Sequence, residues 1–317
     1  MSSTHRADQS LLNLLRELSA RGYCFTTVTP ATHARVLARE PQRTGTSLTD
    51  IFGWSLHFAR EALDAGLFEL LERADALADA GPGRWRARCR VSTFDGLYLI
   101  HSAYPTEAGN AVFFGPDSAR FAALIQRHLA GLPAGARIAD YGTGTGIGGL
   151  VAARGAPAGA LVYLCDVNPD ALRLAATNAA HAGVDHDLLS LQQPGEMPDG
   201  LDLIVTHPPF MMDSASRTYR DGGDMLGARL SFDWAIAAAG KLTPGGRLIM
   251  HTGSSIAGGQ DLLKDALTAA VAEEGLTLDY WELETDYYGE ELETPAYRDA
   301  GVERIAMVAA IIDKRAA

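Results

Sequence analysis

The sequence predicts an α/β fold in which a mostly parallel sheet of seven strands is covered by helices on both faces. Three observations predict it. From Arg137 onward, apolar runs of strand length alternate with helical stretches, and the first of these runs ends in a glycine-rich stretch. The first hundred residues mix helical and extended patterns and have no such stretch. With 317 residues, and about 150 residues per domain, the chain has room for two domains. We expect an α+β accessory domain for substrate recognition at residues 1–110 and the α/β domain at residues 111–317.

The N-terminal segment begins with a helical pattern. Leucines recur at helical spacing over residues 11–18, and Ser10 is placed to cap that helix. Residues 47–71 predict two further short helices, broken at Gly66. Residues 84–104 alternate as strands do, with a turn at residues 95–96, an Asp-Gly pair. The segment therefore predicts a small α+β domain.

The rest of the chain predicts the main sheet element by element. Helices are expected at residues 148–153, 169–181, 230–241 and 260–274. Strands are expected at residues 137–142, 161–167, 188–193, 201–209, 247–253, 276–284 and 304–312. In open α/β sheets the ligand crevice lies beyond the carboxyl ends of the strands, where the strand order switches. We therefore expect the functional residues at the carboxyl ends of the first, second and fourth strands.

Composition excludes several classes of protein. Apolar residues make up 47% of the chain, too many for a disordered protein. The formal net charge is -12, from 27 basic and 39 acidic residues, which disfavours a large footprint on nucleic acid. The three cysteines form no Cys-x-x-Cys pair, so we predict neither a disulfide framework nor a metal site. No signal-peptide pattern and no apolar run of about 20 residues occurs, so we expect a cytoplasmic protein without a membrane partner.

The first strand of the sheet leads into a glycine loop. Glycine at positions 142, 144 and 146 lets the backbone turn tightly and approach a ligand, and a helix follows directly. Asp166 ends the second strand, where a carboxylate can bind ribose hydroxyls. Glycines 144, 146 and 149 also match G-x-G-x-x-G, so a nicotinamide dinucleotide remains an alternative, as does a tight turn without a ligand. Asp140 favours S-adenosylmethionine, because a carboxylate suits an ammonium or sulfonium group and repels a pyrophosphate.

The fourth strand ends in Thr-His-Pro-Pro-Phe at residues 206–210. With this motif the chain resembles the class I S-adenosylmethionine-dependent methyltransferases that carry an Asn-Pro-Pro-Tyr type motif, such as the release-factor glutamine N5-methyltransferases. The resemblance covers about residues 113–308. It rests on ADYGTGTGIGG, LCDVNPDALRLAATNA, LDLIVTHPPF and LTPGGRLIM, in the family's order and spacing. It implies a Rossmann-like sheet, S-adenosylmethionine as cofactor and methyl transfer (EC 2.1.1) as activity.

The resemblance also assigns roles residue by residue. Asp166 would bind the ribose, Val167 and Asn168 would flank the adenine, and Gln193 stands where many relatives use Asp for the adenine amine. The catalytic set would be His207, Pro208, Pro209 and Phe210, with His207 also beside the cofactor. The methionine part of the cofactor would be bordered by Asp140, Tyr141, Gly142, Thr143, Gly144 and Gly146.

His207 departs from the family pattern, which has Asn or Asp there. In the family that side chain and the next carbonyl hold the acceptor NH2. A neutral histidine can orient an amine or remove its proton, or it can be only a turn residue. Phe210 would hold the acceptor plane, unless it is a core aromatic residue. The substitution at position 207 argues for an unusual acceptor.

The acceptor itself is ranked from weaker signals. Residues 211–234 are too long for a tight turn and predict a lid or a solvated loop. The acidic segment 286–293 lies between the last two strands and would suit a cationic acceptor if it faces the site. We therefore expect N-methylation of an amine, amide or guanidine of a small molecule or amino acid. Protein glutamine ranks second, RNA or another nucleic acid third, and a nicotinamide-dependent oxidoreductase is the rival outside this class.

Overall fold

The computed structural model describes residues 3–129, 131–213, 217 and 219–316. The chain divides into two compact units that are not contiguous in sequence. The first contains Met1–Ala119, Gly144–Ile147 and Asp170–Asp185. The second contains Arg120–Thr143, Gly148–Pro169 and His186–Ala317. The centre of the glycine loop therefore groups with the N-terminal segment, while the strands on either side of it belong to the sheet.

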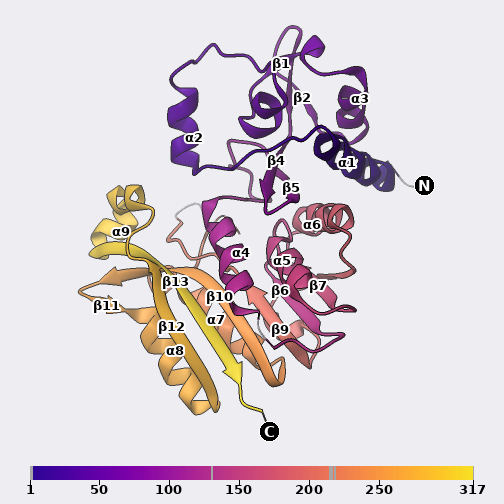
Figure 1. The fold of residues 1–317 in the computed structure, drawn as a ribbon. Helices are drawn as coiled ribbons and strands as arrows, with labels where there is room; N and C mark the ends of the chain where they lie inside the picture. Colours follow the sequence, from indigo (N-terminus) through magenta and orange to yellow (C-terminus); the bar gives the residue numbers. More distant parts are fainter. Residues whose placement is uncertain (1–2, 130, 214–216, 218, 317) are drawn as a thin grey trace. The chain divides into compact units, whose positions relative to one another are not determined.

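The second unit is built on one large sheet (Figure 1) with the strand order β12-β13-β10-β9-β6-β7-β8, and β11 pairs with β10 outside this path. Neighbouring strands from β10 to β8 are parallel, whereas β13 is antiparallel to both β10 and β12. The predicted seven-stranded, mostly parallel sheet is confirmed. The strands are β6 (Arg137–Tyr141), β7 (Leu161–Asp166), β8 (His186–Ser190), β9 (Leu201–Thr206), β10 (Leu242–Ala257), β11 (Gln260–Asp261), β12 (Leu276–Glu284) and β13 (Val302–Lys314).

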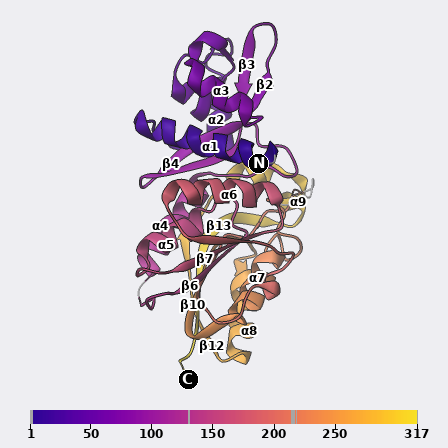
Figure 2. The same cartoon turned by 90° about the vertical axis from the view of Figure 1, so that its right-hand side faces the viewer.

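Helices cover both faces of this sheet. Figure 2 shows α4 and α5 on one face and α7 and α8 on the other. The four strands nearest the middle are buried on both sides, which explains why they appear in the sequence as continuous apolar runs. Shorter helices follow β8 and precede β13. The helical elements are α4 (Pro116–His128), α5 (Ile147–Gly155), η3 (Pro194–Glu196), α7 (Arg229–Ala239), α8 (Leu262–Glu273), η4 (Gly289–Glu293) and α9 (Pro295–Asp299).

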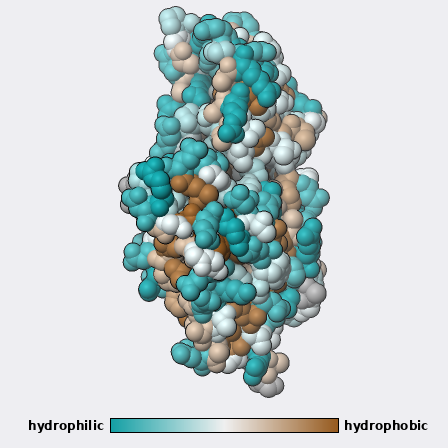
Figure 3. All heavy atoms as spheres, turned by 90° about the vertical axis from the view of Figure 1, so that its left-hand side faces the viewer, coloured by the Kyte–Doolittle hydropathy of each residue, from teal (hydrophilic) through white to brown (hydrophobic). Residues whose placement is uncertain are grey.

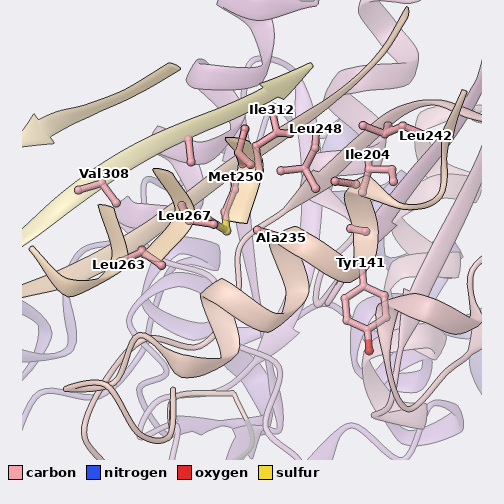
Figure 4. Close-up of a cluster of buried hydrophobic side chains, with 14 of the residues drawn as sticks. Tyr141, Ile204, Ala235, Leu242, Leu248, Met250, Leu263, Leu267, Val308 and Ile312 are labelled. Carbon is pink, nitrogen blue, oxygen red and sulfur yellow. The ribbon is translucent and has the colours of Figure 1, made fainter. Parts of the chain in front are cut away.

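The core of this unit lies between the sheet and helices α7 and α8 (Figure 4). Ile204 of β9 and Leu248 and Met250 of β10 pack there with Leu267 of α8, and each is fully buried. Full burial of one such side chain stabilises the fold by about 1.5–3 kcal/mol. The core therefore fixes the positions of the strands whose ends carry the site.

The register of the sheet brings several strand ends to one edge. Tyr141 at the end of β6 pairs with Thr206 at the end of β9, and Thr206 pairs with Met250 of β10. The strand order reverses at β6, which has β7 on one side and β9 on the other. Strand β10 was predicted to end at Gly253, but it continues to Ala257 along β13. Its last residues therefore extend past the end of β9, which pairs with β10 only as far as Met250.

The first unit has two small antiparallel sheets, β1-β3-β2 and β4-β5, around a core of leucine and aromatic side chains. The turn predicted at Asp95 and Gly96 is present, with φ of 47° and 72°, as a two-residue hairpin requires. The elements are α1 (Ser3–Ala20), α2 (Pro30–Leu37), η1 (Thr49–Gly53), β1 (Phe58–Ala59), η2 (Arg60–Ala62), α3 (Ala65–Arg73), β2 (Leu77–Asp79), β3 (Arg84–Ala87), β4 (Cys89–Phe94), β5 (Leu97–Ser102) and α6 (Pro169–Ala182).

Two local predictions in this unit were wrong. Ser10 does not cap the first helix, because α1 begins seven residues earlier and the Ser10 hydroxyl donates to the Arg6 carbonyl within it. Gly66 does not break a helix either. It lies in the first turn of α3, which Asp64 caps by accepting a hydrogen bond from the Leu67 N–H. Ser10 and Gly66 therefore both occupy helical positions, although serine and glycine have low helix propensity.

Among the described residues, no helix is both long enough and apolar enough to cross a bilayer.

Candidate active site

The glycine loop leaves β6 in a conformation that glycine favours. Gly142, Gly144 and Gly146 have φ of 70°, 52° and 84°, all in the left-handed region. The N–H groups of Gly142 and Thr143 donate to the Cys165 carbonyl of β7, which fixes the start of the loop. A Cβ added at Gly142 would lie 2.7 Å from the ring of Trp234. Any other residue at position 142 would therefore be strained by its backbone and blocked by this indole.

Asp140 lies under the loop and is only 1% exposed. Its Oδ2 accepts hydrogen bonds from the Thr143 hydroxyl at 2.7 Å and from the Gly149 N–H at 2.9 Å, in the first turn of α5. Burial raises the pKa of this carboxyl group to about 7, although both hydrogen bonds favour the charged form. The Asp140 carboxylate thus ties the strand end to the start of α5. Its contact with the cofactor remains a prediction.

The predicted adenosine-binding residues follow the next two strands. Asp166 ends β7, and its Oδ1 accepts the Asn168 N–H at 2.9 Å, so this carboxylate is oriented by its own turn. Val167 is one of three large apolar side chains of the described residues that stay exposed, at 39%. Gln193 is exposed beyond β8, at the start of η3. An apolar side chain next to an oriented carboxylate suits a base and a ribose.

His207 comes directly after β9 and is held by the next strand. Its Nδ1 lies 2.7 Å from the carbonyl oxygen of His251 and 3.3 Å from the Nδ1 of the same residue. Because a carbonyl oxygen only accepts, the proton must be on Nδ1 of His207. In the neutral ring Nε2 then carries the lone pair and can accept a hydrogen bond or a proton. The ring of Phe121 packs 5.6 Å from His207 and 6.3 Å from His251, measured between ring centroids.

The residues after His207 are largely inside the fold. Pro208 is buried and Pro209 is half-buried. Phe210 is 7% exposed; its ring lies 5.9 Å from the His207 ring and 6.0 Å from the Tyr288 ring. A Cβ at Gly253 of β10 would clash with the Phe210 ring, so that ring lies directly on the β10 backbone. Phe210 therefore packs between the His207 ring and the backbone of β10. A stacking contact with an acceptor remains a prediction.

The long segment after the motif is hydrogen-bonded to it. The Met211 N–H donates to the Arg220 carbonyl, and the Gly222 N–H donates to the Met211 carbonyl. Arg220 also forms an ion pair with Glu291 at 2.6 Å, and Arg120 pairs with Glu284. Basic side chains therefore neutralise part of the acidic connection between β12 and β13. Residues 214–216 and 218 of the proposed lid lie outside the described residues.

Three side chains of the site were not singled out from the sequence: Phe121, Trp234 and His251. Phe121 does end a segment, residues 113–121, that the family resemblance suggests can close over the cofactor, and Trp234 ends the predicted lid or loop. Each comes from an element far from the motifs in sequence, namely α4, α7 and β10. His251 lies inside a strand that was recognised, so a polar residue within an apolar strand was its available signal. Trp234 and Phe121 lie on helical patterns, where an aromatic residue usually belongs to the core.

The described residues present the features that S-adenosylmethionine needs. Three glycines with positive φ form the loop after β6, and the start of a helix follows it. Asp166 and the exposed Val167 follow the neighbouring strand. Residues 116–273 match the family model of the methyltransferase small domain. These residues belong to the class I S-adenosylmethionine-dependent methyltransferases. S-adenosylmethionine is the cofactor of this domain, as the sequence predicts.

Curated relatives support the same class. The ribosomal RNA small subunit methyltransferase C of Pseudomonas paraeruginosa is 35% identical over 91 residues, which are 29% of this chain and 27% of that protein. The protein of the same name from Pseudomonas entomophila is 35% identical over 88 residues, or 28% and 26% of the two chains. The matches therefore span about a quarter of these relatives.

A solved structure, Trm5b from Pyrococcus abyssi, superposes with a TM-score of 0.50 at 14% identity, covering 78% of this chain and 68% of that one. This likeness shows the fold alone.

Proposed function

We propose that this methyltransferase transfers a methyl group to a nitrogen of an RNA base. The observation that carries the proposal is the placement of His207 at the end of β9, with its proton fixed on Nδ1 by the His251 carbonyl. This arrangement suits an N–H acceptor, because Nε2 can accept from it. The curated relatives are by name ribosomal RNA methyltransferases, which supports RNA over the small-molecule acceptor that the sequence ranked first.

The charge distribution is compatible with an RNA substrate. Residues 1–110 contain twelve arginines and twelve acidic residues, so the whole acidic excess lies in residues 111–317. Electrostatic binding of RNA depends on where positive charge is clustered, not on the net charge of the chain. The net charge of -12 therefore argues against RNA binding only for the C-terminal segment.

When bound, S-adenosylmethionine supplies an activated methyl group on a sulfonium. The chain then has to align the acceptor and exclude water. His207 would orient the acceptor nitrogen through Nε2 and could take its proton, while Phe121 covers one side of the histidine pair. Asp140 would hold the glycine loop in place through Thr143 and the first turn of α5.

A small cationic acceptor is the second candidate, favoured by the acidic residues of the C-terminal segment. The ion pairs of Glu284 with Arg120 and of Glu291 with Arg220 reduce the negative charge available to attract it. For this reason we place it after RNA.

The test uses cells that lack the gene, because their acceptor is unmethylated. Deproteinised RNA, intact ribosomal subunits, the protein fraction and the metabolite fraction are each incubated with the enzyme and methyl-labelled cofactor. We expect label in RNA or subunits with the wild type and none with His207→Ala, which should bind S-adenosylhomocysteine within a few fold of the wild type. Label confined to metabolites or to protein would refute RNA as the acceptor. Thermal stabilisation by NAD(P) but not by S-adenosylhomocysteine would refute methyl transfer altogether.

A further inference from the structure

A row of arginines in the first unit has no acidic partners. Arg84 and Arg86 lie on β3, Arg88 lies between the two strands, and Arg90 lies on β4, which belongs to another sheet. Arg84 and Arg86 are two residues apart in one strand, so they lie on the same face, about 6.6 Å apart. Among the described residues, no carboxylate lies within ion-pair distance of any of the four, whereas arginines elsewhere in this unit pair with one, such as Arg73 with Glu69.

These four side chains are held by neutral groups instead. Arg86 donates to the carbonyls of Ser55 and Tyr104, Arg88 to that of Leu77 and Arg90 to that of Gly53. Arg84 bonds His57 at 2.9 Å. Carbonyl partners fix a guanidinium in place without neutralising its charge. Arg90 is only 4% exposed. Arg84 and Arg88 are exposed and Arg86 is half-buried, so these three present positive charge that the described residues leave uncompensated.

Arg86 lines a cavity of ≈ 430 Å³ within the first unit, and Arg84 bonds His57, which also lines it. This volume is in the range of small-ligand sites. Its lining includes the apolar side chains of Leu37, Pro41 and Leu56 and the polar side chains of Glu40, His57 and Arg86. Figure 3, which looks onto the side that carries α2, shows a mostly hydrophilic surface over this unit. The cavity therefore combines an apolar wall with a charged one in a polar surrounding.

The charges at the cavity favour an anion on one side and a base on the other. Burial, and then the nearby Arg84 and Arg86, lower the pKa of His57, which indicates a positive potential around this ring. Arg43, which also lines the cavity, is already neutralised by Asp50. Arg86 is thus the cation left for a ligand, and Glu40 is the carboxylate that can accept from an amino group. An apolar wall, one uncompensated arginine and one carboxylate match the base and phosphate of a nucleotide.

We propose that this cavity binds one nucleotide of the acceptor RNA, with its phosphate on Arg86 and its base against Leu37, Pro41 and Leu56. RNA is favoured over a single carboxylate ligand because the exposed Arg84 and Arg88 flank Arg86 in the chain, and repeated cations suit a polyanion. The choice of RNA rests on the proposed function, whereas the nucleotide chemistry rests on the cavity alone.

The test measures binding by the full chain of a fluorescent single-stranded RNA 20-mer, of AMP and of inorganic phosphate. Arg86→Gln removes the cation, and Ala80→Glu places a negative charge at the exposed mouth while leaving every arginine in place. Arg16→Gln on the exposed side of α1 is the matched control. We expect both cavity variants to weaken RNA binding at least tenfold, with the steepest loss at low salt, and the control to match the wild type. Stabilisation by S-adenosylhomocysteine reports folding and should be the same in all.

Wild-type RNA affinity in both cavity variants would overturn the proposal and leave RNA methylation untouched. If AMP binds in an Arg86-dependent way and RNA does not bind at all, RNA is not the source of the bound nucleotide. That outcome would overturn the proposed function as well, while keeping a nucleotide site. Binding of none of the three probes by the wild type would overturn the site itself.

Discussion

Replacing Asp140 by Asn should separate the stability of the glycine loop from its charge. The two hydrogen bonds of this side chain go to one oxygen, Oδ2, from the Thr143 hydroxyl and the Gly149 N–H. An Asn side chain can accept both through its single carbonyl oxygen. The variant therefore keeps the shape and the hydrogen bonds and removes only the buried ionisable group.

The expected size of the effect follows from the pKa. Burial raises the pKa of Asp140 from 3.8 to about 7 in the folded chain. The folded state then binds a proton that the unfolded state has released, so this contribution to stability is complete below about pH 4 and is lost as the pH rises through 7. A pKa difference of about three units corresponds to about 4 kcal/mol, since each unit is worth about 1.4 kcal/mol.

Urea unfolding from pH 4 to pH 8 measures this difference. Trp234 is a suitable probe, because its ring lies edge-on against Tyr141 at 4.6 Å, beside the loop. We expect the free energy of unfolding of Asp140→Asn, relative to the wild type, to rise by up to about 4 kcal/mol from pH 4 to pH 8. Other titrating groups are common to both proteins and cancel.

Parallel pH curves for the two proteins would refute the reasoning. They would mean that the two hydrogen bonds and the start of α5 stabilise the carboxylate fully, and that its pKa is ordinary. A second measurement tests contact with the cofactor. If Asp140 borders the sulfonium, the variant should weaken S-adenosylmethionine more than the uncharged S-adenosylhomocysteine.

Three further substitutions test the site. His207→Asn restores the family's amide and should keep partial methyl transfer, whereas His207→Ala should abolish it; equal rates for Ala and wild type in the labelling assay would reduce His207 to a turn residue. Gly142→Ala should destabilise the fold by about 1–3 kcal/mol and weaken cofactor binding, because φ at this position is 70° and the added Cβ would meet Trp234. An unchanged affinity for S-adenosylhomocysteine in calorimetric titration would contradict this. Gly253→Ala should displace the Phe210 ring and lower kcat more than cofactor affinity, and equal losses in both would argue for general unfolding.

The local pattern of apolar residues was enough to predict the main sheet. Strands buried on both faces are continuous apolar runs, and β12 was predicted with its observed ends, Leu276–Glu284. The wider extent of β10 was not predicted, because its last residues include glycine and serines, which have low strand propensity. They are held there by antiparallel pairing with β13, a long-range interaction. Helix α2 was missed for a similar reason, since Thr29 caps a segment with little apolar periodicity.

The site was predictable where it lies on a continuous motif. The glycine loop, Asp166 and His207 were all placed from strand ends and spacing. The partner that fixes the proton on His207 was not, because His251 is 44 residues away and meets it only through the pairing of β9 with β10. The burial of Phe210 could not be inferred either, since it depends on a glycine in a neighbouring strand.

Asn178 shows why the glycine loop cannot be understood from its own sequence. This fully buried residue of α6 accepts a hydrogen bond from the Ile100 N–H of β5 and donates to the Ile100 carbonyl and to the Thr145 carbonyl of the loop. An amide is needed for all three bonds, because it both accepts and donates. The centre of the loop is therefore fixed by a strand of the N-terminal segment, while its start is fixed by Asp140 and Cys165 of the sheet.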